Sequence, residues 1–134
     1  MYMYSSIYLV QNSLARAVLH TVKRRDHITP YLRKLHWLPV QQRIHFKICV
    51  LTYKCTHNNA PPYLQELINP YIPPRRLRSS DANLLSVPTL KSGSGRRSFS
   101  FSAPTLWNLL PITIKLSPTL SSFRSLLKTF LFPP

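Results

Sequence analysis

The chain has 134 residues, of which 18 are Lys or Arg and only three are Asp or Glu, giving a formal net charge of +15. This length suffices for one small domain, and a hydrophobic content of 44% argues against a wholly disordered chain. A surface with so little acid repels itself unless a polyanion neutralises it. We therefore expect an anionic partner, with nucleic acid as the first candidate and an anionic membrane surface as the second.

Cysteine and histidine are sparse. Cys49 and Cys55 lie six residues apart, and on a helix their side chains would point about 120° away from each other, so we expect no disulfide. The five histidines are scattered, and the chain has no spacing typical of a zinc site. These features favour a reducing, intracellular compartment, either the cytoplasm or the nucleus.

Residues 1–25 leave a second location open. They contain no acid and four cations, Arg16, Lys23, Arg24 and Arg25, a composition that resembles a mitochondrial transit peptide. A helix that belongs to the fold explains the same residues, and we favour it. No apolar run approaches the roughly 18 residues that a membrane span needs, so we expect no transmembrane segment.

The first half of the chain predicts helices. Apolar residues recur at helical spacing over 5–24, and this helix is expected to end in the cationic run 23–25. Thr29 is typical of a helix cap because proline follows it, at the position of the first helical residue. Residues 40–57 form the longest predicted helix, and 63–69 a short one.

One side of the predicted helix over 40–57 is basic. At 100° per residue, Arg43, Lys47, Lys54 and His57 fall within about 80° of one another, between two apolar flanks. This ridge is either a solvated face or a row of cations that contacts phosphates.

The next segment, 73–80, is an extended basic loop with Arg75, Arg76 and Arg78. Such a run is typical of a nucleic-acid contact or a nuclear-import signal. Strands are predicted over 84–88 and 98–102, where Ser and Phe alternate in the second.

Both glycines of the chain lie between these strands, so 91–97 is the expected hairpin tip, and it carries Arg96 and Arg97. Helices are predicted over 103–110 and after Ser117-Pro118. The fold expected is a mainly α, small helical domain with one short β-hairpin. It comprises residues 1–134 as a single domain, with a helical part over 5–72 and the loop, hairpin and last helices over 73–134.

No catalytic constellation is recognisable. Metal-dependent phosphoryl transfer needs clustered carboxylates, whereas the two aspartates lie far apart and the chain has one glutamate. Two glycines in a Gly-Ser-Gly spacing do not form a phosphate-binding loop, and neither a nucleophile-elbow nor a zinc-protease motif occurs. We therefore predict no catalytic residues, no metal site, no cofactor and no enzymatic activity.

Several short blocks occur in a specific order from Leu9 to Lys128. They are Leu9-Val10-Gln11-Asn12-Ser13-Leu14-Ala15-Arg16, Asp26-His27-Ile28-Thr29-Pro30, Leu35-His36-Trp37-Leu38-Pro39-Val40, Gln42-Arg43-Ile44, Phe46-Lys47, Ala60-Pro61-Pro62-Tyr63-Leu64, Leu77-Arg78-Ser79-Ser80, Phe99-Ser100, Ala103-Pro104, Leu106-Trp107-Asn108, Leu110-Pro111 and Phe123-Arg124-Ser125-Leu126-Leu127-Lys128. In order and spacing, they resemble the C-terminal region of LINE-type (non-LTR) retrotransposon polyproteins, the jockey-like RNA-directed DNA polymerase family. Arg96 departs from this pattern, in which an acid is expected.

The resemblance implies that the endonuclease and the reverse transcriptase of a parent polyprotein lie N-terminal to this segment. The Tyr-x-Asp-Asp metal site of the polymerase has no counterpart here, so polymerase activity is not carried over. What the resemblance does carry over is a thumb and tail that hold RNA or DNA, with the missing reverse-transcriptase core as a further partner.

The function expected is therefore non-catalytic binding of the RNA or DNA phosphate backbone. The candidate contacts are Lys23, Arg24, Arg25, Arg43, Lys47, Lys54, Arg75, Arg76, Arg78, Arg96 and Arg97. Trp37 and Trp107 are candidates for base stacking, although core packing is favoured for both. Two alternatives stay open: an inert relic whose apolar helices belong against the missing core, and a basic amphipathic membrane or mitochondrial peptide over 1–25.

Overall fold

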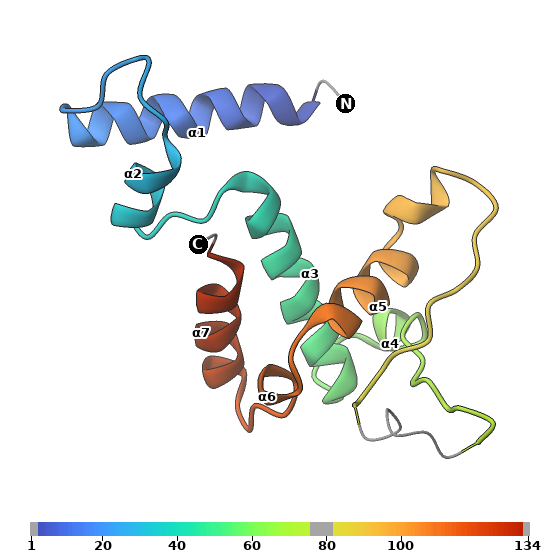
Figure 1. Ribbon diagram of the computed structural model, residues 1–134. Helices are drawn as coiled ribbons and strands as arrows, with labels where there is room; N and C mark the ends of the chain where they lie inside the picture. The colour runs from blue at the N-terminus through green and yellow to red at the C-terminus, as the bar shows by residue number, and fades with distance from the viewer. Residues whose placement is uncertain (1–2, 76–81, 133–134) are drawn as a thin grey trace. The chain divides into compact units, whose positions relative to one another are not determined.

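The computed structural model describes residues 3–75 and 82–132 (Figure 1). The described residues form α-helices and one 3-10 turn: α1 (Met3–Leu19), α2 (Thr29–Lys34), α3 (Val40–Thr56), α4 (Pro62–Gln65), η1 (Gly95–Arg97), α5 (Phe99–Leu109), α6 (Ile112–Lys115) and α7 (Leu120–Leu131). The mainly α class is thus confirmed. Two compact units are present, the first of residues 1–44 with 128–134 and the second of residues 45–127. The expectation of a single domain with a division after residue 72 stays a prediction.

In the first unit, α1 contacts α2 through a narrow face. Ala15 is fully buried, and the Gln11 side chain donates a hydrogen bond of 2.8 Å to the Leu38 carbonyl. The predicted end of this helix was wrong, because α1 stops at Leu19 and not in the cationic run. His20 takes a left-handed φ of 48°, which turns the chain out of the helix before Lys23.

The start of α2 also differs from the prediction. Thr29 is its first residue and not its cap, and the preceding Ile28 makes no side-chain capping bond. Proline in the first turn explains the start, because its fixed φ suits a helix and its missing N–H would have no partner there.

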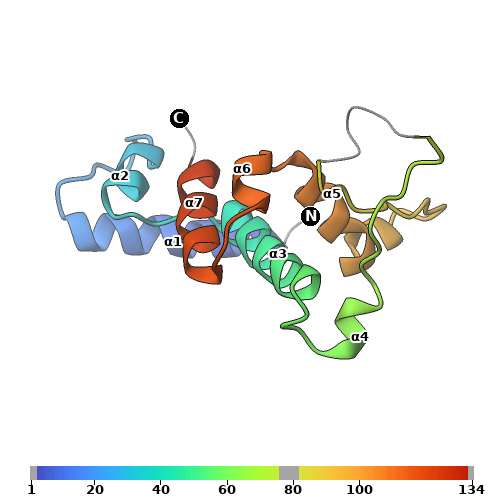
Figure 2. The same cartoon turned by 90° about the horizontal axis from the view of Figure 1, so that it is seen from below.

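The core of the second unit is a column of four rings. The Phe123 ring is fully buried between Tyr53 of α3, at a centroid distance of 4.4 Å, and Trp107 of α5, at 5.9 Å. The ring of His57 continues the column and stacks on Tyr53 at 3.9 Å. The residues 45–56 of α3 and the first turns of α7 therefore lie side by side, as Figures 1 and 2 both show.

The predicted β-hairpin was wrong. Residues 99–102 begin α5, which runs on through the buried Pro104 to Leu109. The alternating serines fit a helix because their hydroxyls have local partners: Ser102 Oγ donates to the Ser98 carbonyl at 2.9 Å. The other predicted strand contributes one antiparallel bridge, between Leu85 and Pro70.

The remaining boundaries shift by a few residues. α4 runs over Pro62–Gln65, whereas the helix was predicted over 63–69. The last helix is capped by Thr119, whose hydroxyl accepts the Ser122 N–H at 3.2 Å, and not by Ser117. Ser117 is instead buried, and its carbonyl accepts the Tyr53 hydroxyl at 2.8 Å, which fixes the segment before α7 against α3.

Candidate nucleic-acid interface

The loop between α1 and α2 presents the first group of candidate cations. Lys23, Arg24 and Arg25 are all exposed. The loop is held in a turn, because Asp26 Oδ2 accepts the Lys23 backbone N–H at 2.9 Å and the Tyr31 hydroxyl at 3.4 Å. The one acid of this loop therefore bonds a backbone amide and a hydroxyl, and it fixes the turn that presents the cations.

Arg16 holds the same loop from α1. One terminal nitrogen of its guanidinium donates to the carbonyls of Arg24, at 3.4 Å, and Asp26, at 3.1 Å. Its Nε is buried and has no hydrogen-bond partner among the described residues. Arg16 thus positions the loop, whereas the neighbouring arginines point their charge to solvent. The sequence analysis counted Arg16 only among the cations of residues 1–25, and no sequence pattern indicates that it holds the loop.

α3 carries the second group. Arg43 and Lys47 are exposed and lie one helical turn apart, and Lys54 is half-buried two turns further along. The ridge was predicted to include His57, which instead follows the end of the helix. Its ring leaves the row of cations and stacks on Tyr53.

The third group lies in the loops of the second unit. Arg96 and Arg97 are exposed in η1, directly before the first turn of α5. Arg75 is exposed where the described segment ends, and the candidates Arg76 and Arg78 lie outside the described residues. The segments on either side are joined by the bond from the Tyr71 N–H to the Leu84 carbonyl, at 2.9 Å.

Further exposed cations were not among the candidates. Arg33 and Lys34 lie in the last turn of α2 and are exposed in the same unit as the α1–α2 loop. The sequence could have indicated them, because Arg33 and Lys34 fall in the last turn of the short helix that starts near Pro30, and cations are favoured at the end of a helix. Trp107, by contrast, is a core residue as favoured: it is 2% exposed, and its Nε1 donates to the Asn83 carbonyl at 2.9 Å. Trp37 is half-buried.

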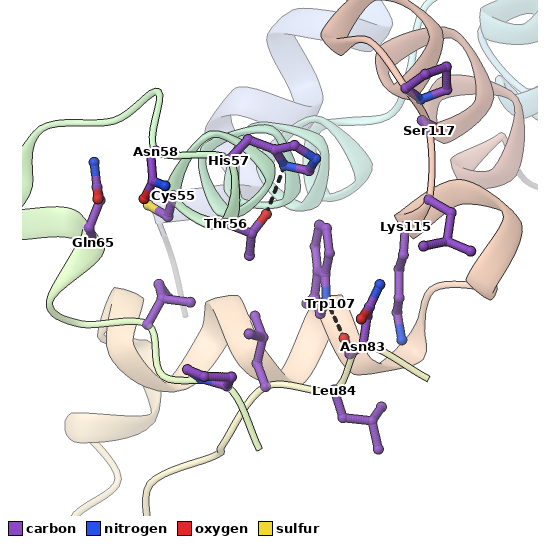
Figure 3. Close-up of a pocket in the computed structure, with 15 residues that line it drawn as sticks. Cys55, Thr56, His57, Asn58, Gln65, Asn83, Leu84, Trp107, Lys115 and Ser117 are labelled. Atoms are coloured by element: carbon purple, nitrogen blue, oxygen red, sulfur yellow. Dashed lines mark hydrogen bonds between the residues drawn. The ribbon is translucent and has the colours of Figure 1, made fainter. Parts of the chain in front are cut away.

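A cavity of about 590 Å³ lies within the second unit, next to the ring column (Figure 3). Trp107 forms part of its wall, and the rest comes from residues 55–58 at the end of α3, from Gln65 of α4 with Ile68 and Pro70 after it, and from the segments 83–85 and 115–118. The described lining residues include Lys115 and His57 but no Asp or Glu. The sequence analysis placed His57 in the basic ridge of 40–57 and gave Lys115 no role. A cation in the apolar run 111–116 was the one available signal.

Lys115 is the buried cation of this cavity. It is 4% exposed, and its amino group donates to the Ala82 carbonyl at 3.2 Å. Desolvation by burial lowers the pKa of the Lys115 ammonium, because the charged form loses water that one carbonyl replaces only in part.

The two cysteines are buried and free. Burial raises the pKa of the Cys49 thiol to about 12, so the thiol stays protonated at neutral pH. The pKa of Cys55, which lines the cavity, is raised for the same reason. Within residues 3–75 and 82–132, no group of three or more His, Cys, Asp or Glu could hold a metal ion.

Comparisons of the chain with protein-family models, with curated proteins and with solved structures find no match. Among the described helices, none has the length and apolar character needed to cross a bilayer.

Proposed function

We propose that this chain binds the phosphate backbone of RNA or DNA without catalysis of its own, as the C-terminal part of a retrotransposon reverse-transcriptase polyprotein. The observation that carries the proposal is the charge: +15 overall, with exposed cations in three groups that few acids offset. The ordered motifs from Leu9 to Lys128 support the assignment to such a polyprotein.

The arrangement of the cations fits phosphates better than bases. Lys23, Arg24 and Arg25 extend from a loop, and Arg43 and Lys47 form a row along one helix. Each such contact releases counterions from the nucleic acid, which gives affinity without sequence preference. Reading bases in a major groove would need a helix or a β-ribbon with side chains directed at base edges, whereas Lys23, Arg24 and Arg25 lie in a loop.

Arg96 and Arg97 give independent support. They lie next to the N-terminus of α5, an 11-residue helix, where the helix dipole disfavours positive charge. Two cations at the positive end of a dipole raise the local potential, and a phosphate is the group that such a place attracts. Without a bound anion, the two cations next to the positive end of the helix dipole would only destabilise the fold.

A second candidate is supported by the outer face of α1. Ile7, Val10, Leu14 and Val18 are all exposed, with Val10 at 58% and Leu14 at 52%, and they lie along one side of the helix. Such a stripe is typical of a helix that docks on another protein, here the missing polymerase core, or on an anionic membrane. A chain lacking residues 1–25 that keeps its localisation and its nucleic-acid affinity would argue against the membrane or mitochondrial alternative.

The proposed function is tested by fluorescence anisotropy of labelled single-stranded RNA and duplex DNA, titrated with the full chain at several salt concentrations. We expect saturable binding with a slope of log affinity against log salt of about −4 or steeper, since several phosphates are contacted together. A soluble, folded chain that shows no saturable binding at low salt would exclude the proposal and favour the inert relic.

A further inference from the structure

The cavity beside the ring column differs from the basic loops because it is a half-open hollow lined by both polar and apolar side chains. At about 590 Å³, it lies within the range of about 300–1,000 Å³ typical of small-ligand sites. Its described lining offers an ammonium, an imidazole and the amides of Asn58, Gln65 and Asn83, but no carboxylate. This combination suits an anion attached to a flat ring with hydrogen-bonding edges.

The polar groups are divided between two ends of the cavity. In Figure 3, Asn58 and Gln65 lie at one end, Asn83 and Lys115 at the other, and the Trp107 ring stands between them. Gln65 Nε2 donates to the Ala60 carbonyl at 2.5 Å, which leaves its amide oxygen able to accept. No described residue hydrogen-bonds the side-chain amide of Asn58, an exposed residue that lines the cavity, so both its donor and its acceptor are available to a ligand.

His57 adds a ring and an acceptor. Its Nδ1 lies 2.9 Å from the Tyr53 carbonyl, an oxygen that only accepts, so Nδ1 carries the proton of the neutral ring. Nε2 is then the acceptor of that ring. Tyr53 covers one face of the imidazole, yet His57 remains exposed, so the ring offers stacking surface to a second planar group.

Lys115 supplies the charge at the opposite end. Among the described residues, the Ala82 carbonyl is the one hydrogen-bond partner of its amino group, which can donate two further bonds. A buried ammonium that has no carboxylate among its described neighbours is costly, and a phosphate oxygen nearby would offset that cost by a charge-assisted bond.

We propose that this cavity takes one unstacked nucleotide of a single-stranded nucleic acid, with the base between His57 and the amides of Asn58 and Gln65 and the phosphate towards Lys115. The inference rests on the proposed function, which supplies the strand. Splayed bases that stack on aromatic rings and bond amides are the usual way in which proteins hold single strands. A duplex keeps its bases stacked, so it has no free base that could enter the cavity.

The first test uses the indole N–H signals of the full chain in a ¹⁵N correlation spectrum. The chain has two tryptophans, so the Trp37→Phe variant assigns the Trp107 signal. Adenosine monophosphate should shift the Trp107 signal saturably, whereas adenosine or inorganic phosphate alone should do so at least tenfold more weakly. No saturable shift of Trp107 with the monophosphate overturns the proposal.

Two variants test the two ends of the cavity. Asn58 has a φ of 56°, so Asn58→Gly removes the amide and keeps the backbone relaxed. Lys115→Met removes the charge and keeps an unbranched side chain that is one atom shorter. Each should weaken monophosphate binding about tenfold, and Asn59→Ala, an exposed neighbour outside the cavity, is the matched control.

The strand test separates the cavity from the phosphate contacts. Asn58→Gly should lower the affinity for single-stranded RNA about tenfold and leave duplex DNA affinity unchanged. If both substrates bind Asn58→Gly as they bind the unchanged chain, the cavity proposal fails while the proposed function stands. If the unchanged chain binds the monophosphate but neither single-stranded RNA nor duplex DNA, the claim that the cavity takes a nucleotide of a strand is refuted, and the proposed function fails with it.

Discussion

The paired cations Arg43 and Lys47 allow the phosphate contacts to be measured directly. Both are exposed, one turn apart on α3, and the double substitution Arg43→Gln/Lys47→Gln leaves the ring column untouched. Each phosphate contact contributes about 0.9 to the salt slope on duplex DNA and about 0.7 on single strands. The double variant should therefore flatten the slope by about 1.8 on duplex DNA and about 1.4 on a single strand.

The matched control is the pair Arg124 and Lys128, which has the same i, i+4 spacing and the same exposure on α7. Arg124→Gln/Lys128→Gln removes the same charge from a face outside the candidate interface. Anisotropy titrations at four or more salt concentrations give the slopes of the three chains. If both double variants flatten the slope equally, net charge alone sets the binding, and the assignment of the α3 row as an interface is refuted.

Four further predictions follow from the packing and the buried charges. Phe123→Ala removes the centre of the ring column and should lower the free energy of unfolding by about 3–5 kcal/mol in urea titrations, and a loss below about 1 kcal/mol would contradict the column as the core. Asn108→Ala breaks both bonds that its amide makes with the Leu85 backbone, each at 2.9 Å, and should destabilise by about 1–3 kcal/mol in the same assay, with an unchanged midpoint as the contrary result. Arg16→Met should accelerate tryptic cleavage within the α1–α2 loop, whereas an unaltered rate would mean that the loop keeps its conformation without the guanidinium. Burial lowers the pKa of Lys115 in the folded state, so the unfolded state binds this proton more tightly and the stability of the unchanged chain rises with pH towards the unfolded pKa. Lys115→Met should therefore stabilise the chain at pH 7, and by progressively less as the pH rises through the folded pKa of Lys115. A difference in urea midpoints that does not change with pH would contradict this.

The helices that the sequence predicted best are those in which periodicity and packing agree. α3 was predicted to within a residue, because its apolar flanks recur at helical spacing over more than four turns. The prediction of a hairpin was wrong because the Ser-Phe alternation over five residues has the two-residue period of a strand. The same serines are compatible with a helix, because their hydroxyls can hydrogen-bond backbone carbonyls of the preceding turn, as Ser102 does. Pro104 adds to the difficulty, since proline inside a helix is uncommon and favours a helix that starts at 103 over one that starts at Phe99.

The candidate site was predictable only where charge alone decides. Lysines and arginines in a loop such as 23–25 are exposed because burying an unpaired cation is costly, so their positions followed from composition. The cavity did not follow, because His57 and Lys115 come together only through the packing of α3, α5 and the segment before α7. The spacing of these residues along the sequence does not indicate that they lie close together in the fold. The loop-holding role of Arg16 could not be predicted for the same reason, since its bonds to the loop depend on where α1 ends.

The most direct test of phosphate binding replaces the phosphates themselves. A single-stranded oligonucleotide with neutral methylphosphonate linkages keeps its bases and sugars but loses the backbone charge. We expect the chain, at +15, to bind the natural oligonucleotide saturably with an affinity that falls steeply with salt, and to lose nearly all of that affinity on the neutral one. Equal affinity for the two oligonucleotides would contradict the central claim, because the exposed cations would then contribute nothing to binding.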